Sequence, residues 1–379
     1  MRNFFSRYVN APDWECLRVT YSAHTSCTLG VSSATILSIS VFETEHMSDK
    51  TVLITGGAGF IGSHLVDRFI AEGDRVAIID DLSGGNRDNL NPNVEFYECD
   101  LRSASRANEL ISTIRPEIVY HLAANAAENK AQFSPIDITS RNYDTFINTF
   151  VPALRNGLKR VIVTSSIAVY GNQQAPFKET AVPEPEDLYG VSKLSMEKSL
   201  HILSKVHQFE YVITRPHNVY GPRQNMRDPY RNVVTIFMNA LLKGESYYIY
   251  GDGSQQRCFS YIDDVVNALQ VCATAPVNGM TFNVGSDAAH TLNELSEVLQ
   301  QVVGTSLPPK YLPSRPLDVP IAIADHTLAK QHLRYEDTTS LREGIGRTWE
   351  YAKKLGYQQP EYGGIELDSP LIPKNWRNE

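Results

Sequence analysis

Three side chains have the types and spacing of a proton-transfer site: Ser166, Tyr189 and Lys193. Tyr189 and Lys193 stand four residues apart (YGVSK), so on a helix they share one face and the ammonium group lies near the phenol. A free phenol titrates near pH ~10 and is a poor base at neutral pH. A neighbouring Lys⁺ favours the phenolate and lowers that pKa. The pattern predicts a proton-abstracting tyrosine, with a solvent-facing helix pair as the alternative.

Ser166 strengthens this interpretation. It ends a short apolar run, 161–166, of the kind that forms a strand covered on both faces in a parallel sheet. Ligands of open α/β sheets bind at the carboxyl ends of the strands, so a hydroxyl there can hydrogen-bond a reacting substrate oxygen.

A glycine-rich turn indicates the cofactor. Gly56, Gly59 and Gly62 are spaced G-x-x-G-x-x-G between an apolar run and a stretch with helical apolar spacing. Glycine lets a ligand approach the backbone closely, and the free N–H groups and positive dipole of a helix start suit a pyrophosphate. Asp80 ends the next apolar run, 18 residues after Gly62, where a carboxylate can bind an adenine ribose and repel a 2′-phosphate. These features predict NAD rather than NADP.

Neighbouring residues are expected to contact the same cofactor. Phe60 and Ile61 lie within the turn, and Asp81 is a second acid beside Asp80. Asp100, which precedes Leu101, either meets the adenine edge or caps a turn or helix.

Five short apolar runs, separated by helical patterns, must position these residues. They span 51–55, 75–80, 118–123, 161–166 and 211–215. Strand, helix and strand within about 30 residues form a βαβ unit, which calls for a doubly wound parallel sheet. We therefore expect an α/β fold with a Rossmann domain over 47–216 and a smaller C-terminal substrate-binding lobe over 217–357. The tail, 358–379, is expected to be a surface extension.

The first 46 residues do not match this pattern. They mix Arg2, Arg7 and Arg18 with several acids and precede a second methionine, Met47. We interpret residues 1–46 as an upstream start or a disordered extension. The alternative is a transit peptide, which is usually rich in Arg and Ser and poor in acids.

Composition argues against several classes of protein. The chain has 379 residues, of which 42% are hydrophobic, and a net charge of −8, which allows a sizeable core and argues against nucleic acid as the main partner. The five cysteines have no metal-ligand spacing, so we expect no metal and reduced cysteines. No apolar run reaches the roughly 18 residues of a membrane helix. A cytoplasmic protein without membrane contact is expected.

Further motifs join these patterns: HLAA at 121–124, RPHNVYGP at 215–222 and RCFSYIDDV at 257–265. Together with the glycine turn and the Ser, Tyr and Lys residues, they resemble the extended short-chain dehydrogenase/reductase family, and within it the UDP-galactose (UDP-glucose) 4-epimerases, over roughly 50–357. The resemblance implies a homodimer that binds NAD and a UDP-sugar. It also implies that Leu122, Ala123 and Ala124 lie beside the cofactor.

The resemblance implies a role for each catalytic residue. Tyr189 would remove the proton from the sugar 4-hydroxyl while hydride leaves C4, Lys193 would hold the nicotinamide ribose, and Ser166 would hydrogen-bond the 4-oxygen. Hydride would return to the opposite face of a 4-keto sugar, so NAD would be regenerated in each cycle.

The resemblance also implies a substrate site. Arg257 and Arg315 would clamp the diphosphate, because a guanidinium group suits phosphate oxygens, and Asp318 would hold the uridine ribose. The other residues expected there are Asn218 near the sugar and diphosphate, Asn232 and Val233 beside the nucleotide, and Ala322 near C2 of the sugar. A small residue at 322 predicts acceptance of UDP-N-acetylhexosamines as well as UDP-hexoses.

Two features bear on the choice of reaction. Ile167 and Ala168 follow Ser166 where similar 4,6-dehydratases carry an acid–base pair, which favours a 4-epimerase. The stretch 125–130 departs from the usual epimerase sequence, which leaves the sugar open. The alternatives are another nucleotide-sugar epimerase, such as one for UDP-glucuronate, a dehydratase, and a non-catalytic NAD-sensing protein.

Overall fold

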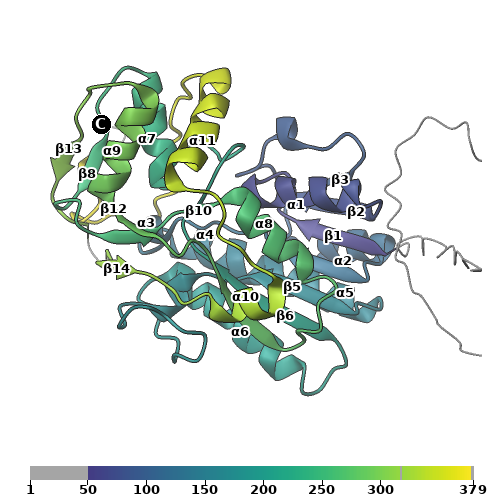
Figure 1. Ribbon diagram of the computed structural model, residues 1–379. Helices are drawn as coiled ribbons and strands as arrows, with labels where there is room; N and C mark the ends of the chain where they lie inside the picture. The colour runs from purple at the N-terminus through teal and green to yellow at the C-terminus, as the bar shows by residue number, and fades with distance from the viewer. Residues whose placement is uncertain (1–49, 316–317, 377–379) are drawn as a thin grey trace, which may run out of the picture. The chain divides into compact units, whose positions relative to one another are not determined.

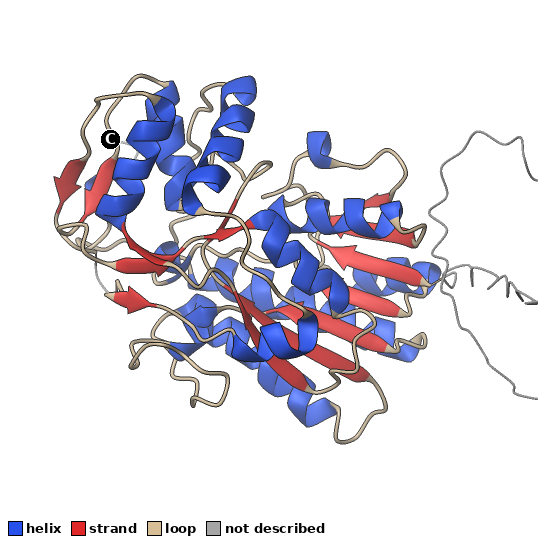
Figure 2. Cartoon of the chain, viewed as in Figure 1, coloured by secondary structure: helices blue, strands red, loops and turns tan. Residues whose placement is uncertain are grey.

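A seven-stranded parallel sheet lies at the centre of the described residues, 50–315 and 318–376, of this computed structural model (Figures 1 and 2). Its strand order is β11-β6-β5-β4-β1-β2-β3. This is the expected doubly wound arrangement, with two strands that were not predicted added at its edges, β11 beside β6 and β3 beside β2. The strands are β1 (Thr51–Thr55), β2 (Arg75–Asp80), β3 (Glu95–Glu98), β4 (Ile118–His121), β5 (Arg160–Thr164), β6 (Glu210–Pro216) and β11 (Met280–Val284). The predictions for residues 1–46 lie outside the described part of the chain.

The sheet is covered by helices on both faces, which explains its continuous apolar strands. Alternate residues of β1 face opposite ways: Val52 and Ile54 join one core cluster, and Leu53 joins the other. The first face is covered by α1 (Phe60–Ala71), α8 (Ile262–Val271) and α10 (Thr327–Leu333). The second face is covered by α2 (Ala104–Ile114), α5 (Thr145–Arg155) and α6 (Leu188–Leu203).

The elements of a smaller lobe are interleaved in sequence with β11, α8 and α10 of the sheet layer, and the core of the lobe is continuous with the first of these clusters. Its helices are α7 (Val233–Leu242), α9 (Leu292–Val303) and α11 (Leu341–Leu355). Short strands connect them: β8 (Tyr248–Tyr250) pairs with β13 (Lys310–Leu312), β7 (Val219–Tyr220) with β10 (Ser260–Tyr261), and β9 (Gln256–Cys258) with both β12 (Ala289–Thr291) and β14 (Ile321–Ala322).

Short helices occupy the connections near the carboxyl ends of the strands. They are α3 (Glu128–Ala131), α4 (Pro135–Thr139), the π-helix η2 (Ser140–Asp144), and the 3-10 helices η1 (Arg87–Asn89), η3 (Ile167–Tyr170) and η4 (Lys374–Trp376). Within the described residues, no helix is long and apolar enough to cross a membrane.

The C-terminal segment 358–376, here called the strap, lies mostly at the surface, but a few contacts anchor it to the rest of the chain. Ile372 and Trp376 are buried, and the Trp376 ring meets the Tyr230 ring edge-on at a centroid distance of 4.9 Å. The Glu366 carboxylate accepts hydrogen bonds from the backbone N–H groups of Ile136 and Asp137, at 2.7 and 2.8 Å. The sequence of the strap has no periodic apolar pattern because a few separate contacts, rather than a continuous apolar face, hold it in place.

Candidate active site

A cavity of about 1170 Å³ runs along the carboxyl ends of the strands, lined by residues of both the sheet domain and the smaller lobe. At one end lies the glycine turn, in the middle Tyr189, and at the other end Arg257 and Arg315. Every residue expected to bind cofactor or substrate lines this cavity. The fold therefore gathers the predicted residues at one edge of the sheet.

The glycine turn leaves no room for side chains. Gly56 has a φ of +72°, and a Cβ there would lie 2.8 Å from the Ala123 nitrogen. A Cβ on Gly62 would lie 2.2 Å from the Gly56 carbonyl oxygen. No side chain caps the first turn of α1. The helix start is thus open to a phosphate group, and this cradle suits a dinucleotide.

Asp80 ends β2 at the wall of the cavity. Its carboxylate is buried and accepts hydrogen bonds from the backbone N–H groups of Ala58, at 3.0 Å, and Leu82, at 2.8 Å. Burial raises its pKa, and the two backbone hydrogen bonds oppose that rise. The turn and the carboxylate are thereby locked together, as expected for a ribose-binding acid.

The two other acids have protein partners. Asp81 pairs with Arg141 at 2.6 Å; burial pushes its pKa upward, but hydrogen bonds from Ser83 and Arg141 outweigh burial, so the pKa is lowered. Asp100 pairs with Arg102 at 2.6 Å, mainly through hydrogen bonds that lower its pKa. Both acids remain in the cavity wall, but their ion pairs occupy them.

Helix α6 positions the catalytic pair. The Asp187 side chain caps the helix by accepting a hydrogen bond from the Gly190 nitrogen at 2.7 Å. Tyr189 and Lys193 follow on one face, both buried, with the Lys193 nitrogen 5.6 Å from the centre of the Tyr189 ring. The same ammonium group donates to the Thr164 carbonyl oxygen at 2.7 Å.

Ser166 completes this group from the end of β5. Its Oγ accepts a hydrogen bond from the Ala168 nitrogen at 3.1 Å, and its hydroxyl is close enough to the Tyr189 phenol to favour the phenolate. The structure therefore brings together the three residues predicted from the sequence.

The pKa of Tyr189 is raised in this structure, whereas the sequence predicted that the neighbouring Lys193 would lower it. Burial, followed by repulsion from Glu128, raises the pKa of Tyr189, against the hydrogen bond of Ser166 and the charge of Arg231. Burial also lowers the pKa of Lys193 to about 7. Without a further positive charge in the cavity, Tyr189 is therefore held as the neutral phenol.

A buried ion pair fixes α6 against the sheet. Glu197 of α6 and Arg215 of β6 form a bidentate pair at 2.9 and 2.6 Å. Arg215 also donates to the Tyr170 hydroxyl at 2.6 Å, and Ser165 donates to Glu197. This network joins the ends of β5 and β6 to α6 and thereby orients the helix that carries Tyr189 and Lys193.

The arginines at the far end share one acid. Asp318 pairs with Arg257 at 3.0 Å and with Arg315 at 3.2 Å, and the Arg315 guanidinium lies 4.7 Å from the centre of the Tyr250 ring. Asp318, expected to hold a ribose, therefore engages both expected diphosphate ligands. It holds the two guanidinium groups side by side.

Other expected substrate residues have different settings. Asn232 caps α7, because its side chain accepts from the Val234 nitrogen at 3.1 Å and donates to the Val219 carbonyl at 3.0 Å. Asn218 has a φ of +43° and lies in the cavity wall. Ala322 is buried opposite Arg257 in the β14–β9 pair.

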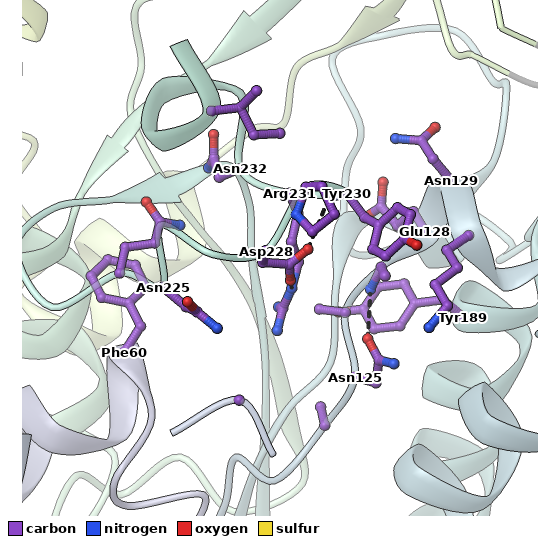
Figure 3. A pocket seen from close by; sticks show the side chains of 18 of the residues that line it. Phe60, Asn125, Glu128, Asn129, Tyr189, Asn225, Asp228, Tyr230, Arg231 and Asn232 are labelled. Atoms are coloured by element: carbon purple, nitrogen blue, oxygen red, sulfur yellow. Dashed lines mark hydrogen bonds and ion pairs between the residues drawn. The ribbon is translucent and has the colours of Figure 1, made fainter. Parts of the chain in front are cut away.

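Sequence reasoning missed several residues of the middle of the cavity. Glu128, Tyr230 and Arg231 lie around Tyr189 (Figure 3). Tyr362 and Trp376 of the strap also line the cavity. Glu128 lies within 125–130, and the departure of that stretch from the usual epimerase sequence could have marked it as a residue of the site. Nothing in the local sequence marked the strap.

The fold and the site are those of a Rossmann-type dinucleotide-binding protein whose cavity holds Ser166, Tyr189 and Lys193 together. Residues 52–285 match the NAD dependent epimerase/dehydratase family. A UDP-glucose 4-epimerase of Mycolicibacterium smegmatis is 34% identical over 308 residues, which is 79% of this chain and 97% of that protein. The chain belongs to the NAD-dependent epimerase/dehydratase family.

Other relatives show the breadth of this similarity. The crystal structure of a UDP-glucose 4-epimerase with UDP-glucose from Thermotoga maritima has a TM-score of 0.77 and 36% identity, covering 80% of this chain and 99% of that one. A UDP-N-acetyl-alpha-D-glucosaminuronate decarboxylase of Bacillus cytotoxicus is 29% identical over 324 residues, covering 81% of this chain and 98% of that protein. The relatives therefore act on UDP-sugars by more than one reaction.

Proposed function

We propose that the protein is an NAD-dependent 4-epimerase of UDP-sugars. The observation that carries the proposal is the buried group of Ser166, Tyr189 and Lys193, continued at Ser166 by the apolar Ile167 and Ala168. Ile167 and Ala168 can neither supply nor accept a proton. The proton-transferring residues of the site are thus suited to reaction at a single hydroxyl-bearing carbon. The UDP-glucose 4-epimerases among the relatives support the same reaction.

The chain's own residues divide the work as follows. The glycine turn and Asp80 hold NAD, which when bound accepts a hydride from the sugar and returns it. Lys193 holds the nicotinamide ribose, and Ser166 orients the reacting hydroxyl of the sugar beside Tyr189. With oxidised NAD bound, its positive charge would favour the phenolate form of Tyr189, whose proton would have passed to solvent, and Tyr189 would then accept the proton of the sugar hydroxyl.

The substrate end is suited to a diphosphate. Arg257 and Arg315 present two guanidinium groups held by Asp318, and a bidentate donor matches phosphate oxygens. Ala322 leaves space in the wall beside Arg257. We therefore propose that UDP-N-acetylhexosamines are accepted along with UDP-hexoses.

Product analysis of the protein beginning at Met47 tests both proposals. We expect UDP-glucose and UDP-GlcNAc each to give the 4-epimer with no added NAD, because the cofactor is regenerated in each cycle. Loss of water or of CO₂ from the products would assign a dehydratase or decarboxylase instead. Turnover of UDP-glucose without UDP-GlcNAc would contradict only the role of Ala322.

A further inference from the structure

Glu128, the first residue of α3, places an unpartnered carboxylate in the middle of the cavity (Figure 3). Its side chain has accessible surface, but that surface faces the cavity rather than bulk solvent. Among residues 50–315 and 318–376, no side chain or backbone group forms a hydrogen bond or ion pair with this carboxylate. An unpaired carboxylate in a cavity wall lowers the stability of the protein unless a bound ligand donates hydrogen bonds to it.

The position of Glu128 matches that of the sugar. Glu128 lies near Tyr189 (Figure 3), and it lines the same cavity as Arg257 and Arg315, whose charges reach it. A UDP-sugar whose C4 hydroxyl meets Tyr189 and whose diphosphate meets the two arginines must place its sugar ring between them. The sugar therefore lies beside Glu128.

Glu128 carries its negative charge above about pH 7, and within the described part of the chain no nearby arginine is left unpaired to offset that charge. Burial and repulsion from Asp187 raise its pKa to about 7, and the two arginines oppose that rise while being paired to Asp318. Arg231, whose charge reaches Tyr189, is already paired with Asp228 at 3.1 Å. A sugar carboxylate would have to approach the ionised Glu128 inside the cavity, where the two like charges repel each other.

We propose that Glu128 is a specificity-determining residue that disfavours sugars bearing a carboxylate. This inference rests on the proposed function and narrows its substrate class to neutral UDP-hexoses and their N-acetyl derivatives. Neutral sugars offer hydroxyl donors that the carboxylate can accept. Uronic acid sugars instead bring a second negative charge, so selection operates by repulsion.

Competition binding of UDP-glucose, UDP-glucuronate and UDP tests the proposal, using the NAD-loaded wild type, Glu128→Gln and Glu184→Gln. The first substitution keeps the shape of the side chain and one acceptor oxygen but removes the charge. Glu184 is exposed outside the cavity, so its substitution is a matched charge control. We expect the wild type to bind UDP-glucuronate at least about tenfold more weakly than UDP-glucose, and Glu128→Gln to close that gap about tenfold.

The outcomes separate this inference from the proposed function. UDP lacks the hexose that would lie beside Glu128, so it reports on the nucleotide site alone. Its affinity should be the same in all three proteins. Equal binding of both sugars by the wild type, or an unchanged ratio in Glu128→Gln, overturns the role of Glu128 while the epimerase proposal stands. Failure to bind UDP at all overturns both. If Glu128→Gln does not fold, the wild-type comparison decides alone.

Discussion

The protonation of Tyr189 is the central question at the residue scale. Burial and Glu128 favour the neutral phenol, whereas Ser166 and Arg231 favour the phenolate. Lys193, with its pKa lowered to about 7, donates to a backbone carbonyl rather than to the phenol. The chain alone thus keeps its base inactive, and we infer that the charged cofactor completes it.

Removal of the phenol hydroxyl should stop the chemistry but not the binding. For Tyr189→Phe we expect kcat to fall about 10²- to 10⁴-fold, because a positioned proton acceptor is lost. Bound NAD should be retained, since the glycine turn and Asp80 are untouched. The measurement is epimer formation together with the cofactor content of the purified protein.

Tyr143→Phe is the matched control. The Tyr143 hydroxyl pairs with Ser199 on the same helix α6, at 2.8 Å, outside the cavity lining. It should turn over substrate at close to the wild-type rate. Full activity in Tyr189→Phe would disprove the catalytic role of that tyrosine.

At the element scale, the strap controls the wall that carries Glu128. Ser134 donates to the Gly364 carbonyl, the Tyr230 hydroxyl donates to Gly363 O at 3.1 Å, and Glu366 caps the start of α4. These contacts join the strap to both α4 and the segment before α7. The strap therefore acts as a brace for the substrate side of the cavity.

Loss of the terminal anchor should loosen this brace. Trp376→Ala removes a buried ring from Tyr230, a kind of change that costs about 3–5 kcal/mol in a core. We expect KM for UDP-sugars to rise several-fold with little change in kcat, and protease cleavage within 358–376 to become much faster. Leu371→Ala, at an exposed position of the same strap, should change neither. An unchanged KM with rapid cleavage would show that the strap does not support the site.

At the scale of the whole molecule, buried neutral histidines tie stability to pH. Burial lowers the pKa of both His121 and His217 to about 3. His217 also shares a 2.8 Å contact between ring nitrogens with His326, whose pKa burial lowers too. Below about pH 6.5 these histidines become protonated in the unfolded chain but stay neutral in the folded chain. Stability is therefore unaffected by them above that pH and falls as the pH drops toward 3.

His217→Gln should flatten this acid dependence. Each histidine that is protonated only in the unfolded chain makes the free energy of unfolding change by about 1.4 kcal/mol per pH unit. Removing one such histidine should therefore reduce this slope by about that amount. The free energy of unfolding in urea at pH 7, 6 and 5 measures the slope separately from any loss of absolute stability. His207→Gln, at an exposed position, should keep the wild-type slope. An identical slope in both variants would contradict the assignment.

The amino-acid sequence by itself determined the sheet domain and its catalytic core. Glycine spacing, the acid that ends β2 and the Tyr-Lys pair all depend on residues close together in the chain, so local geometry is enough to place them. The apolar runs predicted strands because both faces of this sheet are covered. Parallel pairing then brings their carboxyl ends, and Ser166 with them, to one edge.

Only the tertiary structure decided the surroundings of that core. The strap meets α4 across 230 residues of sequence, and Asp318 meets Arg257 across 61. Such contacts are not encoded in periodicity, because each rests on one or two side chains that packing brings together. The same holds for Glu128: its charge matters through the cavity around it, which no short segment of sequence describes.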